Sequence, residues 1–443
     1  MSGVQPSSEL AAQTVWPVDR IKDRALKIGS GVTPSGGAAS YLDAGIPLLR
    51  SQNVHFDGLR LDDVAYIAEE THEEMSGTKL RSRDVLLNIT GASIGRCAFV
   101  PDGFGEGNVN QHVCIIRPAA KLNYKFLTYC LSAPWGQDQV FSSFTGASRQ
   151  GLGQRDLGEI QVPFPPLPEQ QRIAVYLDAS CAAIDAAVAA KRRQLETLDA
   201  LRKSITLQAV TKGLDPNVPM RETGIDWIPQ IPAHWETTKL TSLFWFRKGA
   251  RAGEITQKYI AEYPGEFPVY SGQTEDGGLM GSIDSFEFDF DSPVIFVTTV
   301  GAKAMSTRLV RGKFSISQNC ALIIPWHRKT RVDYFEPTIQ ELFDFERRSI
   351  ALIMQPSLRF KDLKKFRLPL PPLAEQAVIR ARLDAKLGQA KRIATGIESQ
   401  ITTLTAYRKS LIHECVTGQR RVADEDVRRA GHSERSQPTE RKA

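Results

Sequence analysis

Apolar residues recur every three or four positions along the segment from Pro163 to Gly213, in a pattern typical of a long helix. Pro168 fits the first turn of that helix, and Glu169 places negative charge near its N-terminus. No glycine or proline follows until Gly213, which fits the helix end. At ~1.5 Å per residue, the segment predicts a rod of roughly 65 Å.

The same segment occurs a second time, 206 residues further along the chain. Residues 165–211 align with residues 371–417 without a gap, and 18 of these 47 positions are identical. The identical positions include Pro-Pro-Leu, Glu-Gln, Leu-Asp-Ala and Arg-Lys-Ser. An internal repeat of this kind fixes the architecture before any local preference is considered.

Both copies carry an apolar seam with a seven-residue period over about five heptads, which predicts a coiled coil. Two such helices in one chain most simply pack against each other, and a two-fold axis between the repeats would make them antiparallel. Arg202 and Arg408 occupy the same seam position. They either extend past the end of the seam into solvent or pair with a partner chain. The predicted seam residues are Leu177, Ile184, Val188, Leu195, Leu198, Ile205, Leu383, Leu387, Ile397, Ile401, Leu404 and Leu411.

The remaining chain predicts an α+β protein. It contains two similar mixed α/β globular domains, two long antiparallel helices between them and a pseudo-two-fold repeat. Strands are predicted at Ile46–Leu49, Val85–Ile89, Val113–Ile116, Val294–Val300 and Ala321–Pro325, and helices at Lys125–Ser132 and Thr338–Phe345. The predicted segments are a flexible N-terminus (1–14), domain 1 (15–162), helix 1 (163–213), a Pro-rich connector (214–234), domain 2 (235–368), helix 2 (369–418) and a disordered charged tail (419–443).

Composition places the chain among ordinary globular proteins, with 42% hydrophobic and 24% charged residues. No run of 18 apolar residues occurs and the N-terminus is polar, so we expect neither a transmembrane helix nor export. Six scattered cysteines without metal-ligand spacing favour reduced thiols and a cytoplasmic location. The net charge is only +6, and residues 1–162 carry 15 basic and 17 acidic side chains. Bulk charge alone therefore does not indicate nucleic-acid binding.

No catalytic set emerges from the motifs. Gly29–Gly37 is glycine-rich but lacks the Lys-Ser/Thr of a phosphate-binding loop, and Gly103–Gly107 is too short for a dinucleotide fingerprint. The Asn/Asp-Pro-Pro-aromatic tetrapeptide expected of an adenine methyltransferase is absent. The histidines do not pair at metal-ligand spacing, so we expect no metal site and no cofactor bound by this chain.

Instead, polar loops recur at corresponding places in the two domains. Arg, Asn and Gln side chains make the common contacts to base edges, while Ser, Thr and backbone amides hold phosphates. Each loop alone is more often an ordinary turn, and their recurrence is what favours DNA binding. The candidate DNA-binding residues are Thr33, Arg50, Gln52, Asn53, Asn88, Thr90, Ser93, Arg96, Asn110, Gln111, His112, Arg149, Gln150, Lys248, Arg251, Tyr270, Ser271, Gln273, Thr298, Thr299, Lys303, Gln318 and Asn319.

The repeated Pro-Pro-Leu-x-Glu-Gln segment and its heptads resemble the specificity subunit of type I restriction-modification systems. The stretches Ile46–Asn53, Leu86–Arg96 and Trp227–Trp235 are similar to target-recognition domains of that family. The resemblance covers roughly residues 15–418. It implies two target-recognition domains, each reading one half of a split double-stranded DNA site, with the helices as spacer.

The resemblance also implies the partners. Two modification (methyltransferase) subunits would dock on this chain and carry S-adenosylmethionine, and restriction subunits would translocate and cut DNA using ATP and Mg. The chain itself would be a non-catalytic recognition and scaffold subunit in a bacterial or archaeal cytoplasm. Two alternatives remain at this point: a methyltransferase or nuclease in one chain, and a coiled-coil adaptor that does not bind DNA.

Overall fold

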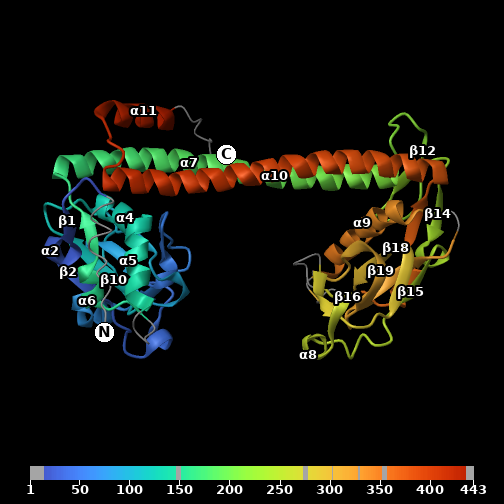
Figure 1. Ribbon diagram of the computed structural model, residues 1–443, viewed down its shortest axis with the longest axis horizontal. Helices are drawn as coiled ribbons and strands as arrows, with labels where there is room; N and C mark the ends of the chain where they lie inside the picture. Colours follow the sequence, from blue (N-terminus) through green and yellow to red (C-terminus); the bar gives the residue numbers. More distant parts are fainter. Residues whose placement is uncertain are drawn as a thin grey trace. The chain divides into compact units, whose positions relative to one another are not determined.

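The structure is a computed structural model that describes residues 14–145, 151–272, 278–301, 303–327, 330–351 and 357–435. The chain divides into two compact units (Figure 1). Unit 1 comprises Met1–Arg192 and Glu398–Ala443, and unit 2 comprises Arg193–Ile397. Helices α7 (Leu167–Lys212) and α10 (Leu373–Thr417) therefore each contribute one half to each unit. The boundaries between the units fall in the middle of both helices. In the predicted segments, by contrast, each helix was a segment of its own, separate from the two domains.

Unit 1 is built on an antiparallel four-stranded sheet. One face packs on α4 (Tyr124–Ser132) and α7 through a large apolar core, and the other face packs on a three-stranded sheet. The strand order of the larger sheet is β2 (Ala25–Ser30), β10 (Val113–Pro118), β7 (Val85–Asn88), β8 (Cys97–Phe99), and that of the smaller is β6 (Ala65–Ile67), β3 (Ile46–Leu49), β9 (Asn108–Val109).

Shorter elements complete unit 1. Strand β1 (Val18–Arg20) pairs with β11 (Gln161–Pro163) where the chain enters α7, and β4 (Val54–His55) pairs with β5 (Gly58–Leu59). The short helices are α2 (Ile21–Arg24), α3 (Glu69–Glu74), α5 (Pro134–Thr145) and α6 (Gln154–Glu159).

Unit 2 contains a six-stranded sheet, one face of which is covered by α9 (Val332–Ala351). The strand order is β15 (Phe244–Arg247), β20 (Cys320–Pro325), β18 (Phe288–Thr298), β19 (Thr307–Ile316), β16 (Pro264–Tyr270), β17 (Leu279–Ile283). Strand β14 (Glu236–Lys239) pairs with β21 (Arg367–Leu370) where the chain enters α10, and α8 (Gln257–Glu262) precedes β16. These elements confirm the strands and helices predicted in both domains, and the predicted α+β fold class.

Within each unit the two half-helices run antiparallel, because the N-terminal half of one packs on the C-terminal half of the other. Ile184 and Leu411 share the core of unit 1, and Val210 and Leu383 share the core of unit 2. Pro168 lies in the first turn of α7, and Gly213 adopts a φ of 74° directly after its last residue. The twelve predicted seam residues all occupy buried or half-buried positions.

A buried glutamine anchors each long helix to its domain. The Gln170 Oε1 accepts the Asn123 N–H at the start of α4 at 2.8 Å, and its Nε2 donates to the Lys121 and Pro165 carbonyls at 3.1 and 2.8 Å. In unit 2 the Gln376 Oε1 accepts the N–H of Arg331, just before α9, at 3.0 Å. Both side chains are 0% exposed. We call this pair the anchor glutamines.

The connector and the tail differ from the predictions. The connector contains the hairpin β12 (Met220–Glu222) and β13 (Gln230–Pro232), and Trp227 and Ile231 are buried in the core of unit 2. The predicted disorder of the tail is wrong for α11 (Asp424–Arg435), because Val427 packs on the core of unit 1. Arg172 also pairs with Asp424 at 2.9 Å. Residues 1–13 and 436–443 lie outside the described residues.

By length and composition, α7 could cross a membrane, since its most apolar 18 residues have a mean hydropathy of 1.6. Its buried face includes Leu177 and Ile184 and belongs to the core of unit 1, so these apolar side chains contact protein. All six cysteines are buried and free, as expected.

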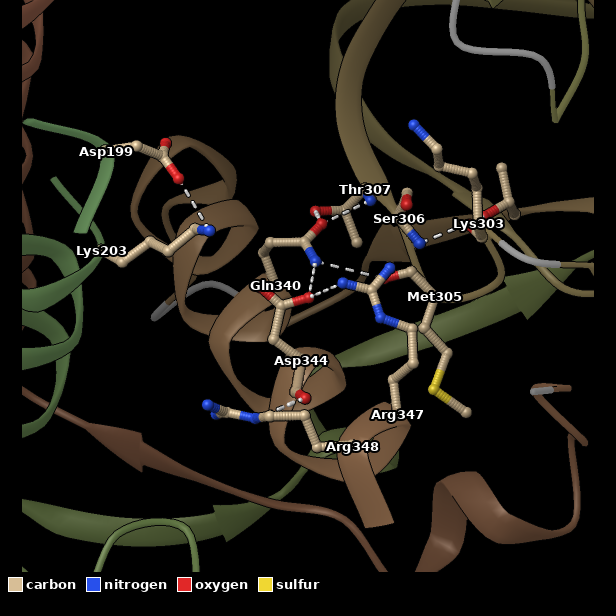
Figure 2. A network of polar contacts seen from close by, with 11 residues as sticks. Asp199, Lys203, Lys303, Met305, Ser306, Thr307, Gln340, Asp344, Arg347 and Arg348 are labelled. Carbon is tan, nitrogen blue, oxygen red and sulfur yellow. Dashed lines mark hydrogen bonds and ion pairs between the residues drawn. The ribbon is translucent and has the colours of Figure 1, made fainter. Parts of the chain in front are cut away.

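Polar contacts attach α9 to β19 (Figure 2). The Gln340 Oε1 accepts the Thr307 N–H at 2.7 Å, and Gln340 also donates to Asp344 at 2.9 Å. Nearby Glu341 is half-buried, and burial together with Asp344 raises its pKa from 4.5 to about 7, against the opposing influence of Arg348 and Lys203. The ionised form of Glu341 therefore destabilises the folded state of unit 2.

We predict that Gln170→Leu lowers the free energy of unfolding by about 2 kcal/mol or more, because it leaves buried backbone groups without partners. For a unit of this size the melting temperature should fall by about 4–8 °C. Gln171→Leu, at the exposed neighbouring position, is the matched control and should leave the melting temperature within about 1 °C. Equal melting temperatures for the two variants would show that the amide does not anchor the helix.

We predict that Glu341→Gln raises the melting temperature of unit 2 at pH 8. A carboxyl whose folded pKa is raised loses stability as pH rises from its unfolded value near 4.5 to its folded value near 7. The gain should therefore shrink as pH falls toward 4.5. Glu196→Gln, at an exposed position on α7, is the control and should show no such trend. A gain independent of pH would contradict the prediction.

Candidate nucleic-acid interface

The predicted polar loops meet at one edge of the main sheet in each unit. In unit 1, Asn88 ends β7 opposite Val113, which begins β10. The loop 89–96 and residues 110–112 therefore lie side by side. In unit 2, Thr298 ends β18 opposite Cys320 at the start of β20, which brings the loop 299–303 beside residues 317–319.

In unit 1 these loops surround a concave surface that encloses a volume of about 1050 Å³. Five candidate residues line it, together with four small residues that the sequence did not single out individually as contacts. The lining residues are Ser51, Gln52, Thr90, Gly91, Ala92, Ser93, Arg96, His112 and Gly151.

Backbone geometry shapes the loop 89–96. Gly95 has a φ of 83°, a backbone conformation that residues with a side chain rarely adopt, so a larger residue there would be strained. The Asn88 Nδ2 donates to the Ser51 carbonyl at 2.8 Å and to the Ser93 Oγ at 3.1 Å. This amide therefore ties the two sides of the concave surface together.

The rim opposite this loop is held by His112. Its Nδ1 contacts the Thr90 Oγ1 at 2.6 Å, and its backbone N–H donates to the Asn110 Oδ1 at 3.1 Å. Gln111 is exposed and its Nε2 lies 3.0 Å from the His112 Nε2. Thr33 is also exposed, in the loop that follows β2 at this edge.

Three candidate amides lie below the surface, so they position the loops and cannot contact DNA directly as they stand. Asn53, Asn88 and Asn110 are 1%, 0% and 5% exposed. Asn53 accepts the Arg50 N–H at 2.9 Å, and donates to the Arg60 carbonyl at 2.9 Å. The Arg50 guanidinium also turns inward, donating to the Asp63 carbonyl at 2.9 Å.

Arg96 has a different environment from these residues. Its side chain lines the concave surface and makes no ion pair or hydrogen bond with the described residues. A guanidinium presented in this way can reach a phosphate or the acceptors of guanine. Gln52 is exposed beside it and is held by Asp63.

In unit 2, Lys248, Lys303, Gln318 and Asn319 are exposed at the equivalent edge. The other candidates serve the fold. Thr298 accepts the Ser306 N–H at 3.1 Å, and Arg251 contacts Tyr259 and Ser285. Ser271, Thr298 and Thr299 are buried, and Tyr270 is half-buried against Phe314. Arg149, Gln150 and Gln273 lie outside the described residues.

One group of side chains in unit 1 lies close enough together to hold a metal: Glu69, His72 and Glu73. The His72 Nδ1 already contacts the Asn108 Oδ1 at 2.5 Å, and Glu73 pairs with Lys79. We therefore interpret this group as structural.

The family model of the type I restriction modification DNA specificity domain matches residues 51–197 and 232–403. The chain belongs to this family of type I specificity subunits. A putative MjaX specificity subunit of Methanocaldococcus jannaschii is 22% identical over 437 residues, covering 92% of this chain and 94% of the relative. The EcoBI specificity subunit of Escherichia coli is 23% identical over 333 residues, covering 70% of this chain and 69% of the relative.

Two solved structures share the fold of this specificity subunit. A chain from work on complex assembly and conformational transition of the type I R-M system superimposes with a TM-score of 0.66 at 16% identity, covering 90% of this chain and 97% of that one. The HsdS subunit from Thermoanaerobacter tengcongensis gives a TM-score of 0.51 at 18% identity, covering 91% and 97%.

We predict that two substitutions in unit 1 affect different properties, one DNA binding and the other stability. Arg96→Gln should leave the melting temperature unchanged, weaken DNA binding of the assembled complex, and lower the salt slope by about one unit. Asn53→Leu should lower the melting temperature instead, because it removes the hydrogen bonds that hold the loop. Unchanged affinity and salt dependence for Arg96→Gln would reject its assignment to the interface.

Proposed function

We propose that each unit reads one half of an asymmetric, bipartite double-stranded DNA site. The helix pair would set the gap between the halves and dock two modification subunits. The chain would be non-catalytic, and restriction subunits would join the same complex. S-adenosylmethionine, ATP and Mg would bind to these partner subunits, in a cytoplasmic complex.

One observation carries this proposal. Each anchor glutamine accepts the backbone N–H just before a domain helix and donates to a proline carbonyl just before its long helix, whereas the polar loops at the opposite end of the sheet differ between the units. Unit 1 presents Thr90, Arg96 and His112 at this edge, and unit 2 presents Lys303, Gln318 and Asn319. Two different sets of side chains on one repeated framework are suited to two different half-sites.

The test is to map modified bases in DNA from cells that carry this chain with its modification subunits. We expect one bipartite motif with two different halves and a constant gap, because the two loop sets differ. Cells with the modification subunits but without this chain are the control and should lack the motif. A perfect palindrome, or modification that does not depend on this chain, would contradict the proposal.

A further inference from the structure

The two seam arginines have different surroundings in the two units. In unit 1 the Arg408 Nε lies 3.0 Å from a carboxylate oxygen of Asp185 across the helix pair. In unit 2 the Nε of Arg202 is buried and has no hydrogen-bond partner among the residues that the structure describes. The seam arginine that pairs with a carboxylate in unit 1 thus has an equivalent in unit 2 that forms no ion pair with the described residues.

The repeat explains the difference. Arg408 corresponds to Arg202 at the offset of 206, and by the same offset Asp185 corresponds to Lys391. The register that places Asp185 opposite Arg408 therefore places a lysine opposite Arg202. Lys391 is exposed and forms no ion pair with the described residues. Arg202, whose Nε is buried, thus faces the cation Lys391 at the position where unit 1 supplies the carboxylate of Asp185.

Two carboxylates in this part of unit 2, one on α7 and one on α9, already form ion pairs (Figure 2). Asp199, one turn before Arg202, pairs with Lys203 at 2.8 Å. Asp344 on α9 pairs with Arg347 at 2.7 Å. Unit 2 therefore does not compensate for the missing carboxylate with one of these groups.

The net charge of the helix halves also differs between the units, and it is more positive in unit 2. The halves in unit 2 carry nine Lys and Arg against four Asp and Glu, whereas those in unit 1 carry five of each. Charge complementarity therefore favours an acidic partner for the half in unit 2. Its basic side chains that form no ion pair with the described residues are Arg193, Arg202, Lys212, Arg382, Lys386, Lys391 and Arg392.

We propose that a docked modification subunit supplies a carboxylate to Arg202 and Lys391. The inference rests on the proposed function and names the chemistry of one docking contact. In unit 1 the group that satisfies this arginine is a carboxylate that reaches Nε itself, at the edge of the seam. A carboxylate on a protein side chain can approach such a buried nitrogen, whereas a phosphate in a duplex backbone is bulkier.

Three variants test the proposal, with assembly followed by native mass spectrometry during titration with the modification subunit. Arg202→Gln should leave the melting temperature of the free chain unchanged or raise it, because the Arg202 Nε is buried without a partner among the described residues, and should weaken uptake of one modification subunit about 10-fold or more. Lys391→Asp should raise the melting temperature, because Arg202 gains a carboxylate within the chain, and should weaken the same uptake. Arg408→Gln is the matched control and should lower the melting temperature without changing uptake.

Unchanged uptake by both Arg202→Gln and Lys391→Asp would overturn the inference while leaving the proposed function intact. Unchanged uptake with a DNA salt slope lowered by about one unit would identify a phosphate as the ligand, and would also overturn it. If the unmodified chain takes up no modification subunit, the docking role in the proposed function fails and the inference fails with it.

Discussion

A fully buried amide at the start of each long helix is the constraint on which the domain arrangement in each unit depends. An amide removed from water without hydrogen bonds costs several kcal/mol, so Gln170 and Gln376 must find partners. The Oε1 of each accepts a hydrogen bond from a backbone N–H at the start of a domain helix. Such N–H groups have no acceptor within their own helix. The start of the domain helix is thereby fixed against the long helix. The main sheet packs on that domain helix, so its position follows.

This arrangement separates the support of each domain from its polar loops. In unit 1, β10 begins beside His112 at the concave surface and ends at Pro118, close to the start of α4. The strand thus spans the distance between the loops and the anchor glutamine. Hydrogen bonds such as that between Thr90 and His112 are made within the loop region. Loop residues can therefore differ between the units while the anchor contacts stay the same.

Local rules were enough to predict α7, because Pro168 fits its first turn and Gly213 adopts a positive φ directly after its last residue, and the repeat then predicts α10. The same rules failed for α11, whose charged sequence predicts disorder. Its position depends on Arg172, more than 250 residues earlier in the chain, and on an apolar core that the sequence does not reveal. The site shows the same limit. Gln52 and Asn53 are adjacent and chemically alike, yet one is exposed and the other is 1% exposed. Only the folded positions of Arg60 and Asp63 determine which amide turns inward.

The repeat makes departures from symmetry informative. An internal two-fold relation predicts equivalent environments for equivalent side chains, and the anchor glutamines follow that rule. Arg202 and Arg408 do not, because one position opposite them changed from a carboxylate to an ammonium group. An unpaired guanidinium whose Nε is buried is a cost to the isolated chain, and a partner that supplies the missing carboxylate recovers it on binding. Salt screens exposed charges such as Lys391 more than buried ones, so the proposed docking on the basic half in unit 2 should depend more strongly on ionic strength than the proposed docking on the balanced half in unit 1. Two docking positions built from one repeat can in this way differ in affinity without differing in fold.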